Sequence, residues 1–272
     1  MPETNSAPTS PVSPEHRAYL KSVRRKQLAV RWTQIIILVL FFFMWEWFAR
    51  LRWIDPFLNS QPSRMIRTII NLYHEGVLFQ HIGITCLETV LGFISGTVLG
   101  TIIAVILWWS NFLARVAEPY LVILNSLPKI ALAPIFIIWI GAGSMAIIVM
   151  ALAISLIVTI LEVLNGFLAV DPDQIKLVQT FGAVKRQILT KVILPASVPA
   201  IINALKINVG LSWVGVIVGE FLVSKSGIGY LIVYGGQVFQ LDLVMSSVLI
   251  LSIAAALMYQ GVVWLEKMLI KK

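Results

Sequence analysis

Long runs of apolar residues alternate with short polar segments along most of this chain. Each run approaches the ~20 residues that a helix needs to cross the hydrocarbon core of a bilayer. Runs of this length without regular polar positions are typical of membrane spans rather than of amphipathic surface helices. The pattern predicts an all-α, polytopic membrane protein with six transmembrane helices, near residues 32–49, 85–109, 116–140, 145–168, 194–222 and 243–265.

Two features modify this simple pattern. The third run contains Pro128 and Pro134, and proline in a helix interior removes a backbone hydrogen bond and kinks the helix. We therefore expect an interrupted span. Between the first two runs, residues 65–73 place apolar side chains at helical spacing, which predicts a short amphipathic helix along the membrane surface.

Composition supports a membrane location. Only 12% of the residues are charged and 58% are hydrophobic, whereas soluble domains carry about 25% charged residues. The net charge of +8 does not indicate nucleic-acid binding, because the basic residues lie in the N-terminal tail and in loops between apolar runs. The single cysteine, Cys86, excludes an intramolecular disulfide.

The distribution of Lys and Arg predicts the orientation. With the N-terminus inside the cell, fourteen basic residues fall in cytoplasmic segments and five in outside segments. This asymmetry favours a multi-pass membrane protein with both termini in the cytoplasm. The segment 171–193 is then also cytoplasmic, and the segment near residues 65–73 is extracytoplasmic.

The chain divides into four predicted parts. Residues 1–31 form a basic cytoplasmic tail, expected to be disordered because it is rich in Pro, Ser and Thr at its start. Residues 32–82 hold the first transmembrane helix and the amphipathic helix. Residues 83–265 form the core transmembrane domain with the loop 171–193, and residues 266–272 form a cytoplasmic C-terminal tail.

No constellation typical of an enzyme is present. The three histidines are scattered and have no cysteines near them, so no metal site or catalytic residue is expected. The phosphate-binding pattern Gly-x-x-x-x-Gly-Lys-Ser/Thr is absent, and its nearest relative, residues 219–226, has Ser224 in place of the second glycine. We expect no cofactor and no ATP hydrolysis by this chain.

Small and polar residues inside the spans predict how the helices pack. Gly92, Gly96 and Gly100 share one helical face and allow another helix to approach closely, within this chain or in a second subunit. Ionisable side chains within a span are costly and usually face a protein interior or water. The polar stripes of the third, fourth and fifth runs give the candidate translocation residues, which are Asn125, Lys129, Glu162, Asn203, Lys206 and Trp213.

The stripes allow two interpretations. They can line a path for a polar or anionic solute, for which Lys129 and Lys206 supply positive charge. They can equally hold the helices together through hydrogen bonds and buried ion pairs, for example between Lys206 and Glu162.

The segment 171–193 is the most distinctive part of the chain. Asp171 and Pro172 are suited to cap and begin a helix, which Gly182 then interrupts, and a second helix is expected from about Val184. In this second helix Ile188, Leu189 and Val192 form an apolar face, and Lys185, Arg186 and Lys191 supply charge.

Gly182 followed twelve residues later by Leu194-Pro195 resembles the "EAA loop" of importer-type ABC transporter permeases. Residues 118–119, 127–141, 210–213 and 226–232 are further similar to the nitrate/sulfonate/taurine/bicarbonate branch. The resemblance implies a permease homodimer in the lipid of the bacterial inner membrane, cytoplasmic ABC ATPase subunits and an extracytoplasmic solute-binding protein. It further implies that the ATPase couples through Gly182, Lys185, Arg186, Ile188, Leu194 and Pro195.

One departure concerns the acidic residue that names this loop. The Glu-Ala-Ala of the family falls on Lys176, Leu177 and Val178, so the glutamate is absent. The resemblance still implies ATP-driven import of a small polar or anionic solute by alternating access. Members of the branch move nitrate, sulfonates, bicarbonate or heterocyclic vitamin precursors, and the sequence does not choose among them.

Two other functions stay open from the residues alone. A secondary transporter driven by an ion gradient, or a membrane scaffold without transport activity, would also have six spans and no phosphate-binding loop. Neither needs a docking helix, so the segment 171–193 favours the ABC permease.

Overall fold

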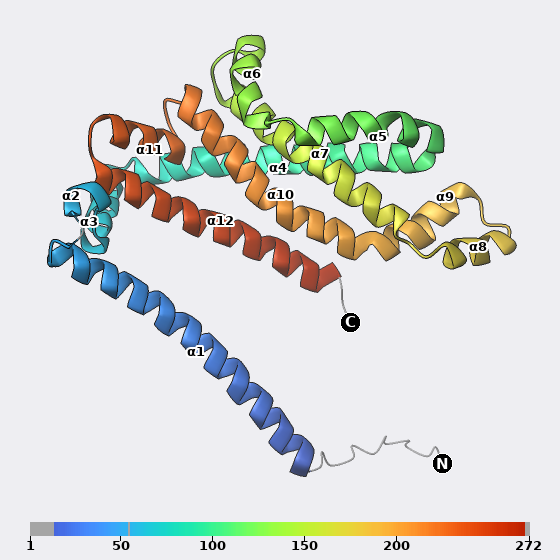
Figure 1. The fold of residues 1–272 in the computed structure, drawn as a ribbon, viewed down its shortest axis with the longest axis horizontal. Helices are drawn as coiled ribbons and strands as arrows, with labels where there is room; N and C mark the ends of the chain where they lie inside the picture. The colour runs from blue at the N-terminus through green and yellow to red at the C-terminus, as the bar shows by residue number, and fades with distance from the viewer. Residues whose placement is uncertain (1–13, 54, 270–272) are drawn as a thin grey trace, which may run out of the picture. The chain divides into compact units, whose positions relative to one another are not determined.

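The computed structural model describes residues 14–53 and 55–269. In this part of the chain the regular structure is entirely helical, as predicted (Figure 1). The helices are α1 (Pro14–Arg50), α2 (Pro56–Asn59), α3 (Pro62–His74), α4 (Leu78–Trp109), α5 (Asn111–Ser126), η1 (Lys129–Leu132), α6 (Ala133–Ile140), α7 (Ser144–Leu168), α8 (Pro172–Thr180), α9 (Lys185–Ile188), η2 (Leu189–Ile193), α10 (Leu194–Val223), α11 (Ile228–Gln237) and α12 (Leu241–Leu269).

The chain forms two compact units, residues 1–63 and residues 64–272. In the first unit α1 is one continuous helix from Pro14 to Arg50, so the disorder predicted for residues 1–31 is wrong from Pro14 onward. The reason is local, because residues 15–50 contain no glycine or proline, and residues 15–31 are rich in the strong helix formers Arg, Lys, Leu and Ala. Residues 1–13 lie outside the described part.

The boundary between the units differs from the predicted one. Residues 32–82 were expected to form one part, whereas Arg64 and the residues after it belong to the larger unit. The amphipathic helix α3 is held there by buried contacts: Leu72 packs in a cluster with residues of α11 and α12. The backbone carbonyl of Met65 also accepts a hydrogen bond from the Ser246 hydroxyl at 3.1 Å.

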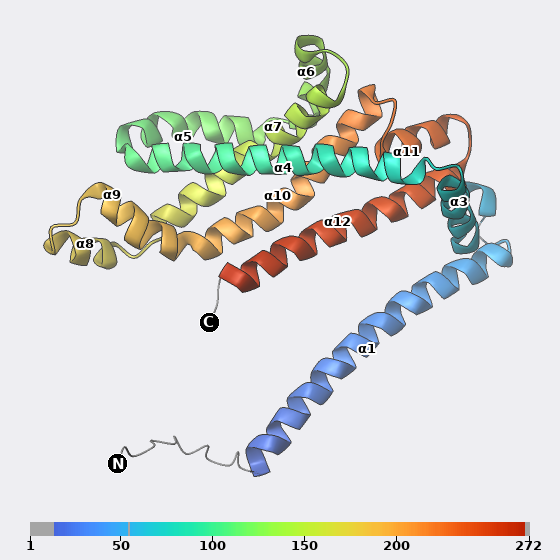
Figure 2. The ribbon, with the colours of Figure 1, turned by 180° about the vertical axis from the view of Figure 1, so that it is seen from behind.

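The second unit is built around α7, which packs against α4 and α10 along much of its length (Figures 1 and 2). α12 lies along α10, and α11 folds back onto α12. Half of the apolar stretch of α7 is buried inside the protein, a larger share than in any other described span. α7 is therefore the central helix of this bundle.

Glycines permit this close packing. An ideal Cβ on Gly92 would lie 2.5 Å from the Ala151 Cβ of α7, and one on Gly100 would lie 2.6 Å from the Thr159 Cβ. Gly96 similarly meets Ser155. The glycine face predicted on the second span thus packs within the chain, on α7, as small residues allow in membrane helices.

The predicted interruption of the third apolar run is confirmed. Within residues 14–53 and 55–269, five helices are long and apolar enough to cross a membrane, and the candidates number six if α5 with η1 and α6, which are bent by 87°, count as one broken span. The break lies at Leu127, whose extended backbone (φ −65°, ψ 139°) is the conformation favoured before a proline. Pro134 does not break the chain, because it occupies the first turn of α6, where its missing N–H has no helical partner.

Candidate functional site

The segment 171–193 leaves the bundle where α7 ends. Asp171 has a non-helical backbone (φ −52°, ψ 119°) and its side chain accepts a hydrogen bond from the Asp173 N–H at 2.9 Å. Pro172 occupies the first turn of α8, as predicted. The Asp171 side chain satisfies one of the free backbone N–H groups at the start of the helix, and Pro172 has no N–H that would need a partner. α8 therefore begins at a fixed point close to the bundle.

Gly182 forms the turn between α8 and α9. Its φ of +81° lies in the left-handed region, which side chains other than glycine adopt at a cost. No atom lies within 4 Å of the position that a Cβ would take, so the requirement is one of conformation rather than of space. The Val184 N–H then donates to the Gln187 side-chain oxygen at 2.9 Å, which fixes the start of α9.

The second half of the segment differs from the expectation in one respect. A docking helix followed by a separate span from Leu194 was predicted, whereas α9, η2 and α10 form one continuous helical stretch over Lys185–Val223. The connecting turn, Leu189–Ile193, is a π-helix. A π-helical turn is wider than an α-helical turn, because its hydrogen bonds span five residues instead of four. The wider turn accommodates Pro195, which lacks the N–H for the regular helical hydrogen bond and whose ring would clash with the preceding turn of an α-helix.

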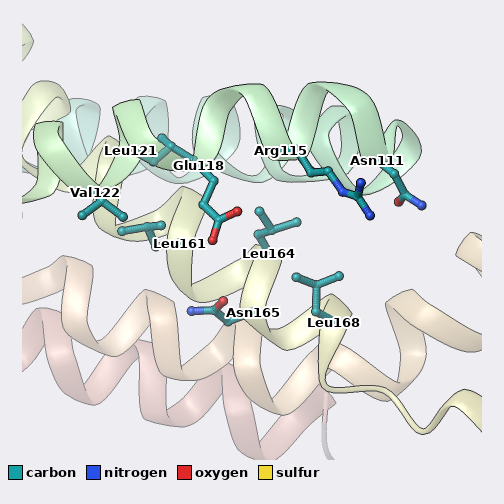
Figure 3. Close-up of a pocket in the computed structure, with 10 residues that line it drawn as sticks. Asn111, Arg115, Glu118, Leu121, Val122, Leu161, Leu164, Asn165 and Leu168 are labelled. Atoms are coloured by element: carbon teal, nitrogen blue, oxygen red, sulfur yellow. The ribbon is translucent and has the colours of Figure 1, made fainter.

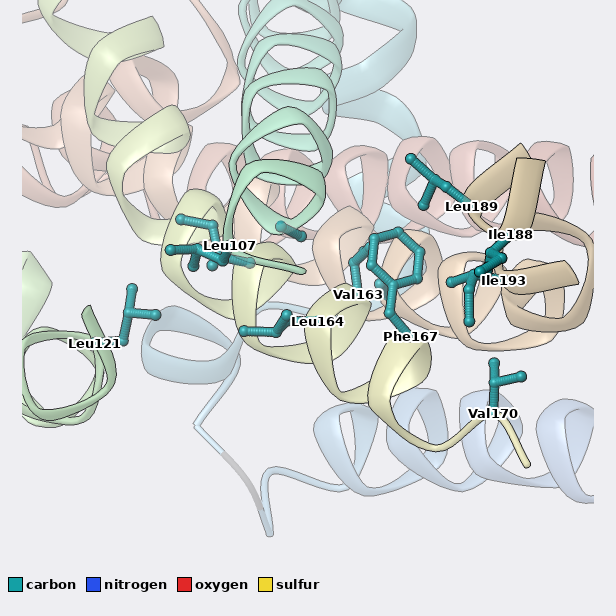
Figure 4. Close-up of a cluster of buried hydrophobic side chains, with 12 residues drawn as sticks. Leu107, Leu121, Val163, Leu164, Phe167, Val170, Ile188, Leu189 and Ile193 are labelled. Carbon is teal, nitrogen blue, oxygen red and sulfur yellow. The ribbon is translucent and has the colours of Figure 1, made fainter. Parts of the chain in front are cut away.

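Buried side chains join this stretch to the bundle (Figure 4). Ile188, Leu189 and Ile193 lie in one cluster with Phe167 and Val163 of α7. Any displacement of α9 must therefore move α7 and α10 with it, or break this cluster.

Lys185 adds a polar attachment to the end of α4. Its ammonium group donates to the Trp109 carbonyl at 2.6 Å and lies 5.8 Å from the centroids of both the Trp108 and Trp109 rings. A cation over aromatic rings contributes about 0.5–1 kcal/mol at an exposed site. Lys185 is therefore an anchor of α9, in addition to its predicted coupling role.

The outer face of the segment is apolar and open. Phe181 is 82% exposed, Val184 60% and Leu177 58%. Next to them is a hollow of about 400 Å³, which is lined by Val178, Phe181, Gly182, Ala183, Gln187, Lys191 and Val192. We call the hollow and these three exposed side chains together the loop surface. Exposed apolar side chains around a concavity are typical of a protein-docking site.

The candidate translocation residues do not converge on one path among the described residues. Lys206 forms an ion pair with Glu266 of α12 at 2.8 Å, so the suggested pair with Glu162 is wrong. Sequence spacing could not reveal this partner, because Glu266 lies outside the stripes, sixty residues along the chain. Trp213 is buried in a cluster with Val209 and Val262, where it fills space between helices.

The remaining candidates are more open. The Lys129 ammonium group donates to the side-chain oxygen of Asn125 at 3.4 Å and to its carbonyl at 3.2 Å, which confirms that these two residues share a face. Asn203 is exposed on α10 and Glu162 is half-buried on α7. Their place in a translocation path stays a prediction.

The buried polar centre of the bundle lies elsewhere. Asn208 of α10 is fully buried and its amide donates to the hydroxyls of Thr159 and, at 3.5 Å, Thr97. These contacts join α10, α7 and α4. Thr159 lies one helical turn before the candidate Glu162 on α7. Asn208 is not among the candidates of its own helix, although its polarity within an apolar run was a signal.

A lateral hollow of about 500 Å³ lies between α5 and α7 (Figure 3). Arg115 and Glu118 border it from α5, and Asn165 borders it from α7, with leucines between them. Glu118 belongs to one of the stretches that resemble the sulfonate branch. The hollow shows that α5 is not packed tightly on α7 along its whole length.

A helical bundle with several candidate membrane spans and an anchored, outward-facing helical loop is the arrangement expected of the membrane subunit of a transporter. The comparison with known families agrees: residues 96–272 match the family "Binding-protein-dependent transport system inner membrane component". The chain belongs to this family.

The relatives place it within the family. It is 30% identical over 231 residues to a probable ABC transporter permease protein of Haemophilus influenzae, covering 85% of this chain and 94% of the relative. It is 28% identical to a putative aliphatic sulfonates transport permease protein of Bacillus subtilis, covering 84% and 83%. The expected nitrate/sulfonate/taurine branch is thereby confirmed.

A solved structure gives the same fold. An inward-facing conformation of the MetNI methionine ABC transporter matches with a TM-score of 0.64 and 20% identity, over 73% of this chain and 98% of that chain. At this identity the likeness concerns the fold alone. It confirms the predicted type I ABC importer fold, and the family assignment makes this chain a multi-pass permease component rather than a scaffold.

Proposed function

We propose that this permease imports a small anionic solute by alternating access, driven by ATPase subunits that dock on the loop surface. The single observation that carries the proposal is the construction of that surface. It is apolar and open on its outer side, and on its inner side Ile188 and Leu189 are buried against the central helix of the bundle.

The transmission of movement follows from the same contacts. α8 is connected to α7 through three residues, and α9 continues into α10 without a break. A partner that pushes on the loop surface therefore acts on α7 and α10, two helices that pack on each other along much of their length. The packed cluster resists small deformation, so a push is expected to switch the bundle between two arrangements instead of bending it.

Two further partners complete the proposed importer. A second copy of the permease supplies the other half of the pathway, and an extracytoplasmic solute-binding protein delivers the solute. Both are supported by the family, whose description is that of a binding-protein-dependent system. An anionic solute is supported by the sulfonate-transport relative.

The decisive experiment is uptake by proteoliposomes that contain the permease, its cognate ATPase and its binding protein. We expect that uptake requires ATP in the compartment that the loop surface faces, whether this is the inside or the outside of the vesicle. Uptake should persist when ion gradients are collapsed. Uptake driven by an ion gradient without ATP would identify a secondary transporter and would refute the proposal.

The proposed orientation can be tested separately. Lys176 and Lys225 are both exposed, and the proposed orientation would have them on opposite sides of the membrane. In a Cys86→Ser background, a membrane-impermeant maleimide added to intact cells is expected to label Lys225→Cys and not Lys176→Cys. Permeabilised cells serve as the control, in which both variants should react. Labelling of Lys176→Cys in sealed cells would contradict the orientation.

The two lysines inside spans should behave differently. Lys206 has its charge offset by Glu266, whereas Lys129 contacts the neutral Asn125. We expect Lys129→Met to reduce uptake about tenfold or more at unchanged membrane abundance, because a hydrogen bond to a charged group contributes about 1.5–3 kcal/mol. The measurement is initial uptake rate normalised to permease in the membrane.

Lys206→Met is instead expected to lower abundance, because it leaves the Glu266 carboxylate partly buried without its partner. The double variant Lys206→Met with Glu266→Gln should recover that abundance. If Lys129→Met transports normally, this lysine is not part of the pathway.

A further inference from the structure

At the end of the bundle away from the loop surface, Glu220 of α10 is 1% exposed. Its carboxyl group accepts a hydrogen bond from the Thr85 hydroxyl of α4 at 2.6 Å and another from the Gly229 N–H at 2.5 Å. Both donors are uncharged. One buried side chain therefore joins α4, α10 and the turn that precedes α11.

The turn at residues 226–229 is built around this carboxyl group. An ideal Cβ on Gly227 would lie 2.2 Å from one Glu220 oxygen, and one on Gly229 would lie 2.6 Å from the other. The turn is also fixed to α4, because the Gly227 N–H donates to the His81 ring at 2.9 Å and the Ile228 N–H donates to the Thr85 hydroxyl at 2.7 Å. Any side chain at either glycine would exclude the carboxyl group.

Glu88 adds a second carboxyl group at the same place. It follows Thr85 by three residues on α4, which puts the two side chains on the same helix face. Its carboxyl group lies beside that of Glu220, and Glu88 is also 1% exposed. Neither oxygen of Glu88 has a hydrogen bond of regular geometry within residues 14–53 and 55–269, and its side-chain neighbours there are Ser144 of α7 and Glu220.

Two ionised carboxylates cannot be stable in this position. Each is an acceptor only, so they offer each other no hydrogen bond, and their like charges repel in a medium of low dielectric constant. One proton removes both problems, because a protonated carboxyl group donates to a neighbouring carboxylate.

We propose that Glu88 and Glu220 bind one proton between them, and that this shared proton holds the turn 226–229 and α10 against α4. Among the described residues, His81 and Cys86 are the titratable neighbours of the pair on α4. The Nδ1 atom of His81 accepts the Gly227 N–H and therefore carries no proton, and the Cys86 thiol packs beside Val209 and Trp213. The site binds a proton and no larger ligand, since Glu220 is already enclosed by the two glycines.

Infrared spectroscopy of the purified full-length permease tests the proton directly. At neutral pH the wild type should show the carbonyl band of a protonated carboxyl group, with a shift when ¹H₂O is replaced by ²H₂O. The band should be absent from Glu88→Gln, because the amide supplies the donor and leaves Glu220 ionised. Glu75→Gln, at an exposed glutamate, is the matched control and should keep the band.

Stability gives a second readout. Raising the pH removes the shared proton and leaves two buried negative charges, so the melting temperature of the wild type should fall from neutral to alkaline pH. Glu88→Gln should lose most of this dependence, whereas Glu88→Ala should lower abundance at every pH because it removes the link to Glu220.

A wild type without the band, or a band unchanged in Glu88→Gln, would overturn the proposal. An equal fall in melting temperature for wild type and Glu88→Gln would also overturn it. These measurements need neither ATPase nor uptake, so their failure is distinct from failure of the proposed transport function.

Discussion

Gly182→Val is expected to abolish ATP-driven uptake while the helical bundle remains folded. The left-handed backbone at Gly182 costs about 1–2 kcal/mol for a residue with a side chain, and more for a β-branched one. The cheapest relief is a rearranged turn between α8 and α9, because no neighbouring atom opposes it. The turn carries Phe181 and Val184, so the loop surface would lose the shape that an ATPase subunit fits.

The measurement is co-purification of the cognate ATPase with the permease, together with uptake. Gly76→Val is the matched control, since Gly76 has a φ of +75° and no atom within 4 Å of a Cβ, but it lies in the turn between α3 and α4. It should cost similar backbone strain and leave ATPase binding intact. Gly182→Asn should retain most activity, because asparagine adopts the left-handed conformation more readily.

Two outcomes would contradict this reasoning. If Gly182→Val keeps normal ATPase binding and uptake, the turn is not part of the docking site. If Gly76→Val loses the ATPase as well, the effect comes from general instability rather than from the loop surface.

Much of the fold was predictable because its signals are local. The six apolar runs, the break at Pro128 and the cap at Asp171 depend on residues that are adjacent or one helical turn apart. The same holds for the turn at Gly182. The glycine face of the second span was also readable, although its partner helix was not.

The parts that sequence reasoning missed depend on distant partners. Lys206 meets Glu266, and Glu220 meets Thr85, across 60 and 135 residues respectively. Helical spacing states which residues share a face and gives no information on which helix that face meets. Glu88 lies on one helix face with Thr85, and this polar pair in the second span was a signal for a buried polar site. Its partner on α10 could not be derived from spacing along α4.

The error at the N-terminal tail has the opposite cause. Pro, Ser and Thr at the start of the chain suggested disorder for all of residues 1–31, but the residues after Pro14 are individually good helix formers and continue into the first span. A span can extend a helix well beyond the membrane, since the costly first turn is already formed.

Close contacts from two helices meet at Ala151 of α7, which is fully buried between two glycines. Gly92 of α4 faces its Cβ, and an ideal Cβ on Gly215 of α10 would lie 2.5 Å from its Cα and 3.0 Å from its backbone nitrogen. Three helices thus cross at one residue. A side chain at Gly215 would meet backbone atoms, which cannot rotate away as a side chain can.

Gly215→Ala is therefore expected to destabilise the permease by about 1–3 kcal/mol, the usual cost of an added methyl group in a close-packed core. The matched control is Gly210→Ala on the same helix, where no atom lies within 4 Å of the new Cβ. This control should be neutral or stabilising by up to about 1 kcal/mol, since alanine favours helix more than glycine does. Thermal unfolding in detergent and membrane abundance measure both variants. Equal stability of Gly215→Ala and Gly210→Ala would show that α7 and α10 do not approach this closely. In that case the proposed transmission of a push from the loop surface through α7 to α10 would be refuted.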